Sequence, residues 1–192
     1  GRTPLEARPD SSSRRWWPAA LLVAVAGVVY AGSLSGVFVY DDDEAIVRNP
    51  HIRSLSPLAD ALTAPPHSAV SGRPLVSLSL ALNHAAGGLD PAGYHVVNIA
   101  LHTLAALVFR ALLVVVLQGP RIAEPIRRSA RGLAFVAALL WLVHPLQSEV
   151  VDYTIQRTES MMGLAALTTL WAGVRGMRAG ATAMRWLALS VA

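Results

Sequence analysis

The sequence predicts an all-α, polytopic membrane protein, and three observations support this fold class. Of its 192 residues, 54% are hydrophobic and only 15% are charged, whereas soluble globular domains carry about 25% charged residues. Apolar runs that approach the length needed to cross a bilayer recur along the chain. The arginines, which supply every basic charge because lysine is absent, gather in alternate segments between these runs.

Composition also limits the chemistry. The chain has no cysteine, which excludes a disulfide framework, a thiolate metal site and a cysteine nucleophile. The formal charge of +4 does not indicate a nucleic-acid partner, because the arginines flank apolar runs. The chain begins at Gly1 and ends at Ala192 inside an apolar run, which indicates a fragment of a longer protein.

The first predicted membrane helix covers residues 16–40, the longest stretch without a charge. At 1.5 Å per residue, part of this stretch is enough to cross the roughly 30 Å hydrocarbon core. Arg14 and Arg15 precede it, which is also typical of a secretory signal peptide, but the run is long and lacks a convincing cleavage site. Residues 1–15 are then a cytoplasmic tail, and residues 16–192 form the membrane domain.

Later apolar runs predict three more complete membrane helices and the beginning of a fifth. The run 132–146 needs a few flanking residues to complete a crossing, and 160–174 is shorter than the usual length of about 20 residues. The expected spans after the first are 94–117, 132–146, 160–174 and, in part, 186–192.

The positions of the arginines predict the orientation of these spans. Basic residues lie in the amino-terminal tail, in 119–131 and in 175–185, and the positive-inside rule places these segments in the cytoplasm. Loops 41–93 and 144–159 are therefore expected on the far side. Within the first loop, residues 73–86 carry apolar side chains at helical spacing, which predicts an amphipathic helix on the membrane surface.

The far-side loops carry the candidate catalytic groups. Four consecutive acids, from Asp41 to Glu44, follow the first span. They are either a solvated acidic loop that helps to set topology or a source of a general base or metal ligand. In the second loop, Arg157 is expected either to pair with Glu149 or Asp152 or to bind a phosphate through its planar guanidinium.

Histidines and an asparagine mark the far-side end of the second span. His95, Asn98 and His102 are spaced at about one helical turn and share a face. They are either site residues or side chains that hydrogen-bond neighbouring helices. His144 precedes a proline at a helix end, where a capping or interfacial role is commoner than a ligand role.

A series of short motifs resembles one protein family. The series occupies about residues 34–170, and its members are Phe38-Val39-Tyr40-Asp41-Asp42, Ile46 with Asn49, Arg73-Pro74-Leu75, Leu82-Asn83, Gly93-Tyr94-His95, Asn98, His102, and His144-Pro145 with Glu149 and Arg157. In content and order it resembles the transmembrane and tetratricopeptide-repeat-containing O-mannosyltransferases and their bacterial relatives. These enzymes are polytopic glycosyltransferases of the GT-C type.

The resemblance implies a function. It implies transfer of a sugar, mannose in the best-known members, from a polyprenyl-phosphate donor to the hydroxyl of an acceptor protein. The site would face the lumen or, in the inner membrane of a bacterium, the periplasm. Asp41 and Asp42 match the family's catalytic acidic pair, and Glu149 and Arg157 match its second-loop motif. Arg157 is then expected to hold the donor phosphate, with Arg73 as the second candidate.

Some features of the family are not found in this chain. Further membrane helices and the tetratricopeptide repeats are absent from the 192 residues, so the chain alone is expected to be incomplete and inactive. Use of a divalent metal is left open, because GT-C enzymes differ in this respect. The alternative functions are a non-catalytic membrane anchor or scaffold and a segment of a transporter, although the polar residues cluster near the far side rather than at mid-membrane.

Overall fold

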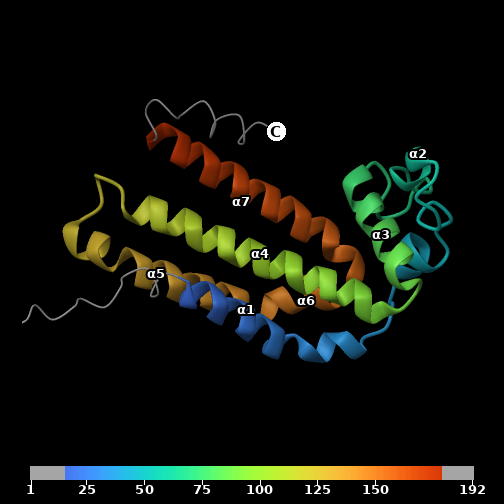
Figure 1. Ribbon diagram of the computed structural model, residues 1–192, viewed down its shortest axis with the longest axis horizontal. Coiled ribbons are helices and arrows are strands. Elements are labelled where there is room, and N and C mark those ends of the chain that lie inside the picture. The colour runs from blue at the N-terminus through green and yellow to red at the C-terminus, as the bar shows by residue number, and fades with distance from the viewer. Residues whose placement is uncertain (1–15, 179–192) are drawn as a thin grey trace, which may run out of the picture.

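The computed structural model describes residues 16–178, and all regular structure in this range is helical. Helices pack into an elongated bundle with a loop-rich cap at one end (Figure 1). The elements are α1 (Trp17–Val29), η1 (Ala31–Ser35), η2 (Asp43–Val47), α2 (Leu58–Ala61), α3 (Pro74–Gly87), α4 (Pro91–Leu117), α5 (Glu124–Leu142), η3 (Pro145–Gln147), α6 (Ser148–Asp152), η4 (Thr154–Gln156) and α7 (Arg157–Arg178). The expected tail 1–15 and partial span 186–192 lie outside the described residues.

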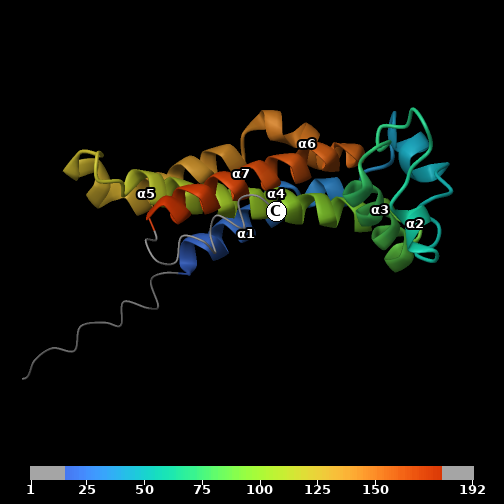
Figure 2. The ribbon, with the colours of Figure 1, turned by 90° about the horizontal axis from the view of Figure 1, so that it is seen from above.

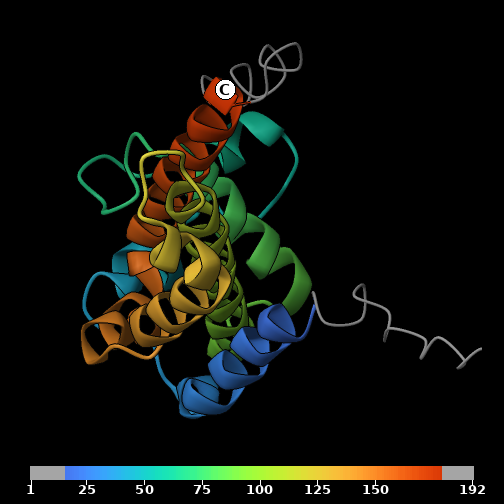
Figure 3. The ribbon, with the colours of Figure 1, turned by 90° about the vertical axis from the view of Figure 1, so that its left-hand side faces the viewer.

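Helix α4 is the centre of the bundle. Viewed along the long axis, α7 lies on one side of α4, and α5 and α1 lie on the other (Figure 3). The packing of α5 follows from small residues on one face: Ala130, Ala134 and Ala138 recur at every fourth position and are buried, as is Leu142. Small side chains at this spacing let two helix backbones approach closely.

The number of membrane spans is smaller than the sequence predicts. Only α4, among the described helices, is both long and apolar enough to cross a membrane by itself. Helix α5 meets the same criterion when it is joined to the segment Pro145–Asp152, which contains η3 and α6. The chain bends by 57° between the two segments. The structure therefore contains one or two candidate spans, and four complete spans are not shown.

The first and fourth expected spans differ from the prediction for identifiable reasons. Helix α1 has 13 residues and is about 20 Å long, because the chain leaves the α-helical conformation at Tyr30. Residues 31–36 are rich in glycine and serine, which favour helices weakly, and they form the 3₁₀ turn η1 instead. Helix α7 has 22 residues, but it does not reach the apolar character of a span.

Helix α5 begins earlier than the expected span at residue 132. Glu124 and Pro125 occupy its first turn, where an acid and a proline are both favourable. The Glu124 carboxylate pairs with Arg127 and Arg128, one turn further along the helix. These exposed pairs stabilise the first turns of α5 by about 0.2–0.5 kcal/mol each, in a segment that the sequence predicts as a cytoplasmic loop.

The cap is built from the long loop between η1 and α4 (Figure 2). Its core contains Ile46, Ile52, Val70 and Leu80 with the ring of Tyr94 from α4. The helix expected over residues 73–86 is confirmed as α3. Its exposed face includes Leu75 and Leu82, and its position on a membrane surface stays a prediction.

Candidate functional site at the capped end of the bundle

Asp42 joins the two loops expected on the far side. Its carboxylate is fully buried and accepts hydrogen bonds from the backbone N–H groups of Ile155, at 2.8 Å, and Val39, at 3.1 Å. Burial raises the pKa of Asp42, and hydrogen bonds from Val39, Ile155 and Thr154 and the charge of His95 oppose this shift. The side chain therefore fixes the end of the first loop against the second.

Asp41, in contrast, is exposed beside a tyrosine of the second loop. Its backbone N–H donates to the Tyr153 hydroxyl at 3.1 Å. The rings of Tyr153 and Tyr40 pack edge to face, with centroids 6.2 Å apart. Burial raises the pKa of the Tyr153 phenol, and the nearby carboxylates of Asp41 and Asp42 raise it further, although the backbone hydrogen bond from Asp41 lowers it. Asp41 thus presents a carboxylate to solvent next to a protonated phenol.

The rest of the acidic run faces solvent. Asp43 pairs with Arg48 at 2.6 Å, and both side chains are exposed. Glu44 is exposed as well. The structure therefore divides the run into one buried acid, Asp42, and three at the surface.

Arg157 is a large, fully buried polar side chain at the start of α7. Its Nε donates to the Asn98 amide oxygen at 2.9 Å, and its Nη2 donates to the Tyr94 carbonyl at 3.0 Å. Its Nη1 lies 3.4 Å from the Ser79 hydroxyl, and its guanidinium carbon lies 5.7 Å from the centroid of the Tyr94 ring. A phosphate contact by Arg157 stays a prediction, and it would require an opening in the surrounding structure, because the guanidinium is fully buried.

His95, Asn98 and His102 are all buried on the same face of α4, as their spacing predicts. Their side chains meet backbone carbonyl groups of the last residue of α5 and of the segment between α5 and α7. Asn98 Nδ2 donates to the Thr154 carbonyl at 3.1 Å, His102 Nε2 lies 3.1 Å from the Leu142 carbonyl, and His95 Nδ1 lies 3.4 Å from the Val151 carbonyl. Carbonyl groups freed where a helix ends need such donors, so these residues hold the second loop on α4.

A cavity of about 420 Å³ lies beside His95. His95 lines it, and among the described residues His95 Nε2 has no hydrogen-bond partner although it is buried. The Ser33 hydroxyl, also in the lining, donates to the Asp152 carboxylate. The polar residues that line the cavity are Tyr30, Ser33, His95, His144, Ser148 and Asp152.

The other predicted site residues are exposed at the surface, and His144 is the one among them that lines this cavity. His144 is exposed, and its Nδ1 accepts a hydrogen bond from the Leu146 N–H at 3.3 Å, so it caps η3. Glu149 is exposed and accepts from Gln156 Nε2 at 3.3 Å. Arg73 is exposed and donates to the Ala69 carbonyl at 2.9 Å. No group of three or more His, Asp or Glu side chains suited to a metal ion occurs in residues 16–178.

Sequence reasoning missed several residues that build this site. Tyr94 and Ser79 hold Arg157, Tyr153 contacts Asp41, and Ser33 contacts Asp152. The sequence does contain a signal for Tyr94, since it lies four residues before Asn98 and therefore on the same helix face. Ser33 and Tyr153 lie outside the long helices, where periodicity gives no such signal.

Replacing Gly36 with alanine is expected to disturb this region. A Cβ at Gly36 would lie 2.8 Å from His95 Nε2 and 2.9 Å from the Ser33 carbonyl. Overpacking of this kind typically costs about 1–3 kcal/mol, which a thermal denaturation series would detect. Gly32→Ala is the matched control, because a Cβ at Gly32 meets nothing within 4 Å. Equal stability of the two variants would contradict the close approach of His95 to Gly36.

Comparison with known proteins identifies relatives. The chain is 35% identical over 171 residues to protein O-mannosyl-transferase TMTC1 of Mus musculus, covering 84% of this chain and 17% of the relative. It is 33% identical over 167 residues to protein O-mannosyl-transferase TMTC4 of Homo sapiens, covering 81% of this chain and 22% of that protein. Protein O-mannosyl-transferase F38B6.6 of Caenorhabditis elegans is 32% identical over 158 residues, with 78% of this chain and 22% of the relative covered.

The chain spans about a fifth of the length of these curated relatives. No protein-family model matches it. No solved structure matches it either. The resemblance carried by the motifs between residues 34 and 170 is confirmed, and the chain is homologous to a small part of the TMTC protein O-mannosyl-transferases.

Proposed function

We propose that this chain forms the membrane-embedded part of a glycosyltransferase. In this proposal a sugar, mannose by analogy with the names of the relatives, moves from a polyprenyl-phosphate donor to a protein hydroxyl on the far side of the membrane. The observation that carries the proposal is the homology to several protein O-mannosyl-transferases over about four fifths of this chain. The junction of the two far-side loops through Asp42 supports a single site there.

The proposal assigns the proton-accepting role to Asp41. A carboxylate near the acceptor can take the hydroxyl proton while the acceptor oxygen attacks the anomeric carbon of the sugar. The bond from that carbon to the phosphate oxygen breaks, and the phosphate leaves on the lipid. A single displacement of this kind inverts the anomeric centre. Asp41 fits this role better than Asp42, since its side chain is exposed whereas Asp42 is enclosed by backbone donors.

The remaining residues take supporting roles. Arg73 is the exposed candidate to neutralise the leaving phosphate. Arg157 positions α4 against the second loop, and it becomes a phosphate ligand only if its buried guanidinium is made accessible. Glu149, at the surface of the second loop, is the second carboxylate of the proposed site. His95 is a further candidate residue of the proposed site, because it lines the cavity of about 420 Å³ described above.

The proposed membrane domain keeps the orientation inferred from the arginines. Helix α4 is its central span, and α5 with α6, α1 with η1, and α7 complete the proposed bundle. The cap and the loop 144–159 face away from the cytoplasm, which in a bacterial inner membrane is the periplasmic side. Bilayer lipid, a lipid-linked sugar and an acceptor protein are the proposed partners.

Cysteine labelling tests this orientation, because the chain has no native cysteine. Ser71 and Ser129 are both exposed, the first in the cap and the second near the start of α5. In intact cells an impermeant maleimide is expected to label Ser71→Cys and not Ser129→Cys, with both labelled after permeabilisation. The reverse pattern would contradict the orientation and the assigned side of the site.

The proposed reaction is tested with the intact protein that contains this chain. Purified protein in detergent is mixed with polyprenyl-phosphate mannose and a serine- and threonine-rich acceptor peptide, and mass spectrometry follows the addition of one hexose. We expect hexosylated peptide from the lipid-linked donor and none from a nucleotide-linked sugar. Absence of transfer by well-folded protein, over a panel of lipid-linked sugars and acceptor peptides, would contradict the proposal and favour a membrane anchor or scaffold.

A further inference from the structure

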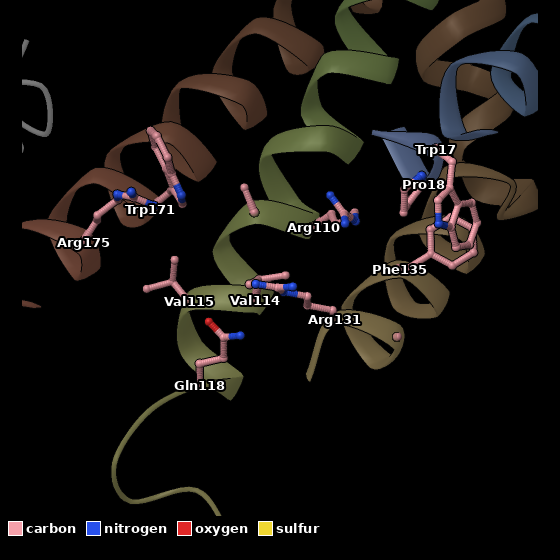
Figure 4. Close-up of a pocket in the computed structure, with 12 residues that line it drawn as sticks. Trp17, Pro18, Arg110, Val114, Val115, Gln118, Arg131, Phe135, Trp171 and Arg175 are labelled. Carbon is pink, nitrogen blue, oxygen red and sulfur yellow. The ribbon is translucent and has the colours of Figure 1, made fainter. Parts of the chain in front are cut away.

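A second cavity, of about 480 Å³, lies at the opposite end of the bundle from the cap. Helices α1, α4, α5 and α7 contribute to its lining, from α1 at one side to α7 at the other (Figure 4). The lining combines arginines with large aromatic side chains. These residues are Trp17, Arg110, Arg131, Phe135, Trp171 and Arg175.

The lining of this cavity is positively charged. Arg110, Arg131 and Arg175 line it, and no carboxylate occurs among the described residues that do so. The like charges of Arg110 and Arg131 repel one another. Arg110 Nε is buried and has no hydrogen-bond partner within residues 16–178. An anion in the cavity would offset the repulsion between Arg110 and Arg131 and would supply an acceptor for Arg110 Nε.

Nearby acids do not supply this anion. Glu124 is the acid in the first turn of α5, and its carboxylate is already hydrogen-bonded to Arg127 and to Arg128, the latter at 2.8 Å. Glu124 also does not line the cavity. An anion that fills the cavity would therefore come from outside residues 16–178.

The depth of the arginines indicates which anion fits. Arg110 lies about two turns before the end of α4, and Arg131 about two turns after the start of α5, so both are roughly 10 Å from a helix end. Arginine side chains at this depth extend toward the headgroup region. Trp17 and Trp171 are of the type that concentrates at membrane interfaces.

We propose that this cavity binds the phosphate of an anionic phospholipid in the cytoplasmic leaflet. Two guanidinium groups can hold phosphate oxygens through charge-assisted hydrogen bonds, and basic pockets between helices on the cytoplasmic side are suited to anionic headgroups. The site differs from the proposed donor site, which lies at the capped end. The inference rests on the proposed membrane orientation and is independent of transferase activity.

Lipid titration of the intact protein in detergent tests this inference. Delipidated protein is titrated with phosphatidylglycerol or phosphatidylcholine, and bound lipid is counted by native mass spectrometry. We expect phosphatidylglycerol to bind about tenfold more tightly, a difference of about 1.4 kcal/mol. The double variant Arg110→Gln/Arg131→Gln is expected to lose this preference.

A matched variant separates the cavity from general surface charge. Arg127→Gln/Arg128→Gln removes the same charge from the same end of the bundle, but neither residue lines the cavity. We expect it to keep the preference for phosphatidylglycerol. Arg131→Glu provides a third variant whose folding is not at issue, because Arg131 is exposed, and it is expected to abolish the preference.

Three outcomes would overturn the inference. The first is equal binding of the two lipids by the unaltered protein. The second is an equal loss of the preference for phosphatidylglycerol in Arg110→Gln/Arg131→Gln and in Arg127→Gln/Arg128→Gln. The third is an unchanged preference in Arg131→Glu. Inorganic phosphate is added alone in a separate arm. If inorganic phosphate raises the thermal stability of the protein as much as phosphatidylglycerol does, the ligand is a soluble phosphate and the assignment to lipid is wrong.

Discussion

Arg157→Gln is expected to lower the free energy of unfolding by about 2–6 kcal/mol, because two buried acceptors each lose a donor at a cost of about 1–3 kcal/mol. The guanidinium is fully buried and donates to Asn98 and to the Tyr94 carbonyl. Glutamine is too short and too poor in donors to replace these contacts. Asn98 and the Tyr94 carbonyl would then lose the donor they have in a site without exposure to water.

Thermal denaturation in detergent measures this loss, with Arg48→Gln as the control. Arg48 is an exposed arginine paired with Asp43, and its loss is expected to cost at most about 1 kcal/mol. A double-mutant cycle of Arg157→Gln with Asn98→Ala should show coupling of about 0.5–3 kcal/mol, because the residues are in contact. A stable Arg157→Gln protein with a raised KM for the donor would contradict the positioning role and support direct phosphate binding.

Substitutions of Asp41 and Asp42 are expected to have different effects on stability and on transfer. Asp42→Asn is expected to destabilise the protein by about 1–3 kcal/mol, the cost of a buried donor without an acceptor. One carboxylate oxygen accepts from Ile155 and the other from Val39, and an asparagine amide nitrogen can accept from neither. Asp41→Asn is expected to leave stability nearly unchanged, since its side chain is exposed, while transfer falls.

The raised pKa of Asp42 predicts a pH dependence of stability. Burial raises the pKa of Asp42 in the folded protein, so the folded state binds a proton at this site more tightly than the unfolded state does. The stabilisation is complete below the ordinary aspartate pKa of about 3.9, and it is lost as the pH rises through the raised pKa. Asp42→Asn should remove this dependence, and Asp41→Asn should keep it. An unchanged pH profile in Asp42→Asn would contradict the assignment.

The parts of the fold that could be predicted were those set by local pattern. A long apolar run over residues 94–117 predicted α4, and helical spacing predicted α3. The end of α1 at Val29 was missed because apolar composition does not distinguish a long span from a short helix followed by a glycine- and serine-rich 3₁₀ turn. The apolar run at 132–146 does not indicate the earlier start of α5, where Glu124 pairs with arginines one turn away.

The candidate site was predictable in composition but not in contacts. The shared face of His95, Asn98 and His102 follows from helical periodicity, and the structure confirms it. The contact between Asp42 and Ile155 joins residues 113 positions apart in the chain, and no local pattern encodes such a pairing. For the same reason Glu149 was expected near Arg157, whereas the structure pairs Glu149 with Gln156 and Arg157 with Asn98.

The central claim is that Asp41 accepts the proton in glycosyl transfer. Its most direct test is the turnover of Asp41→Asn relative to Asp43→Asn, in intact protein whose folding is verified by thermal denaturation. Both variants remove one charge from an exposed acid of the same run, so general effects on topology and charge cancel in the ratio. The account predicts a turnover about 10²- to 10⁴-fold lower for Asp41→Asn, and equal turnover of the two variants would contradict it.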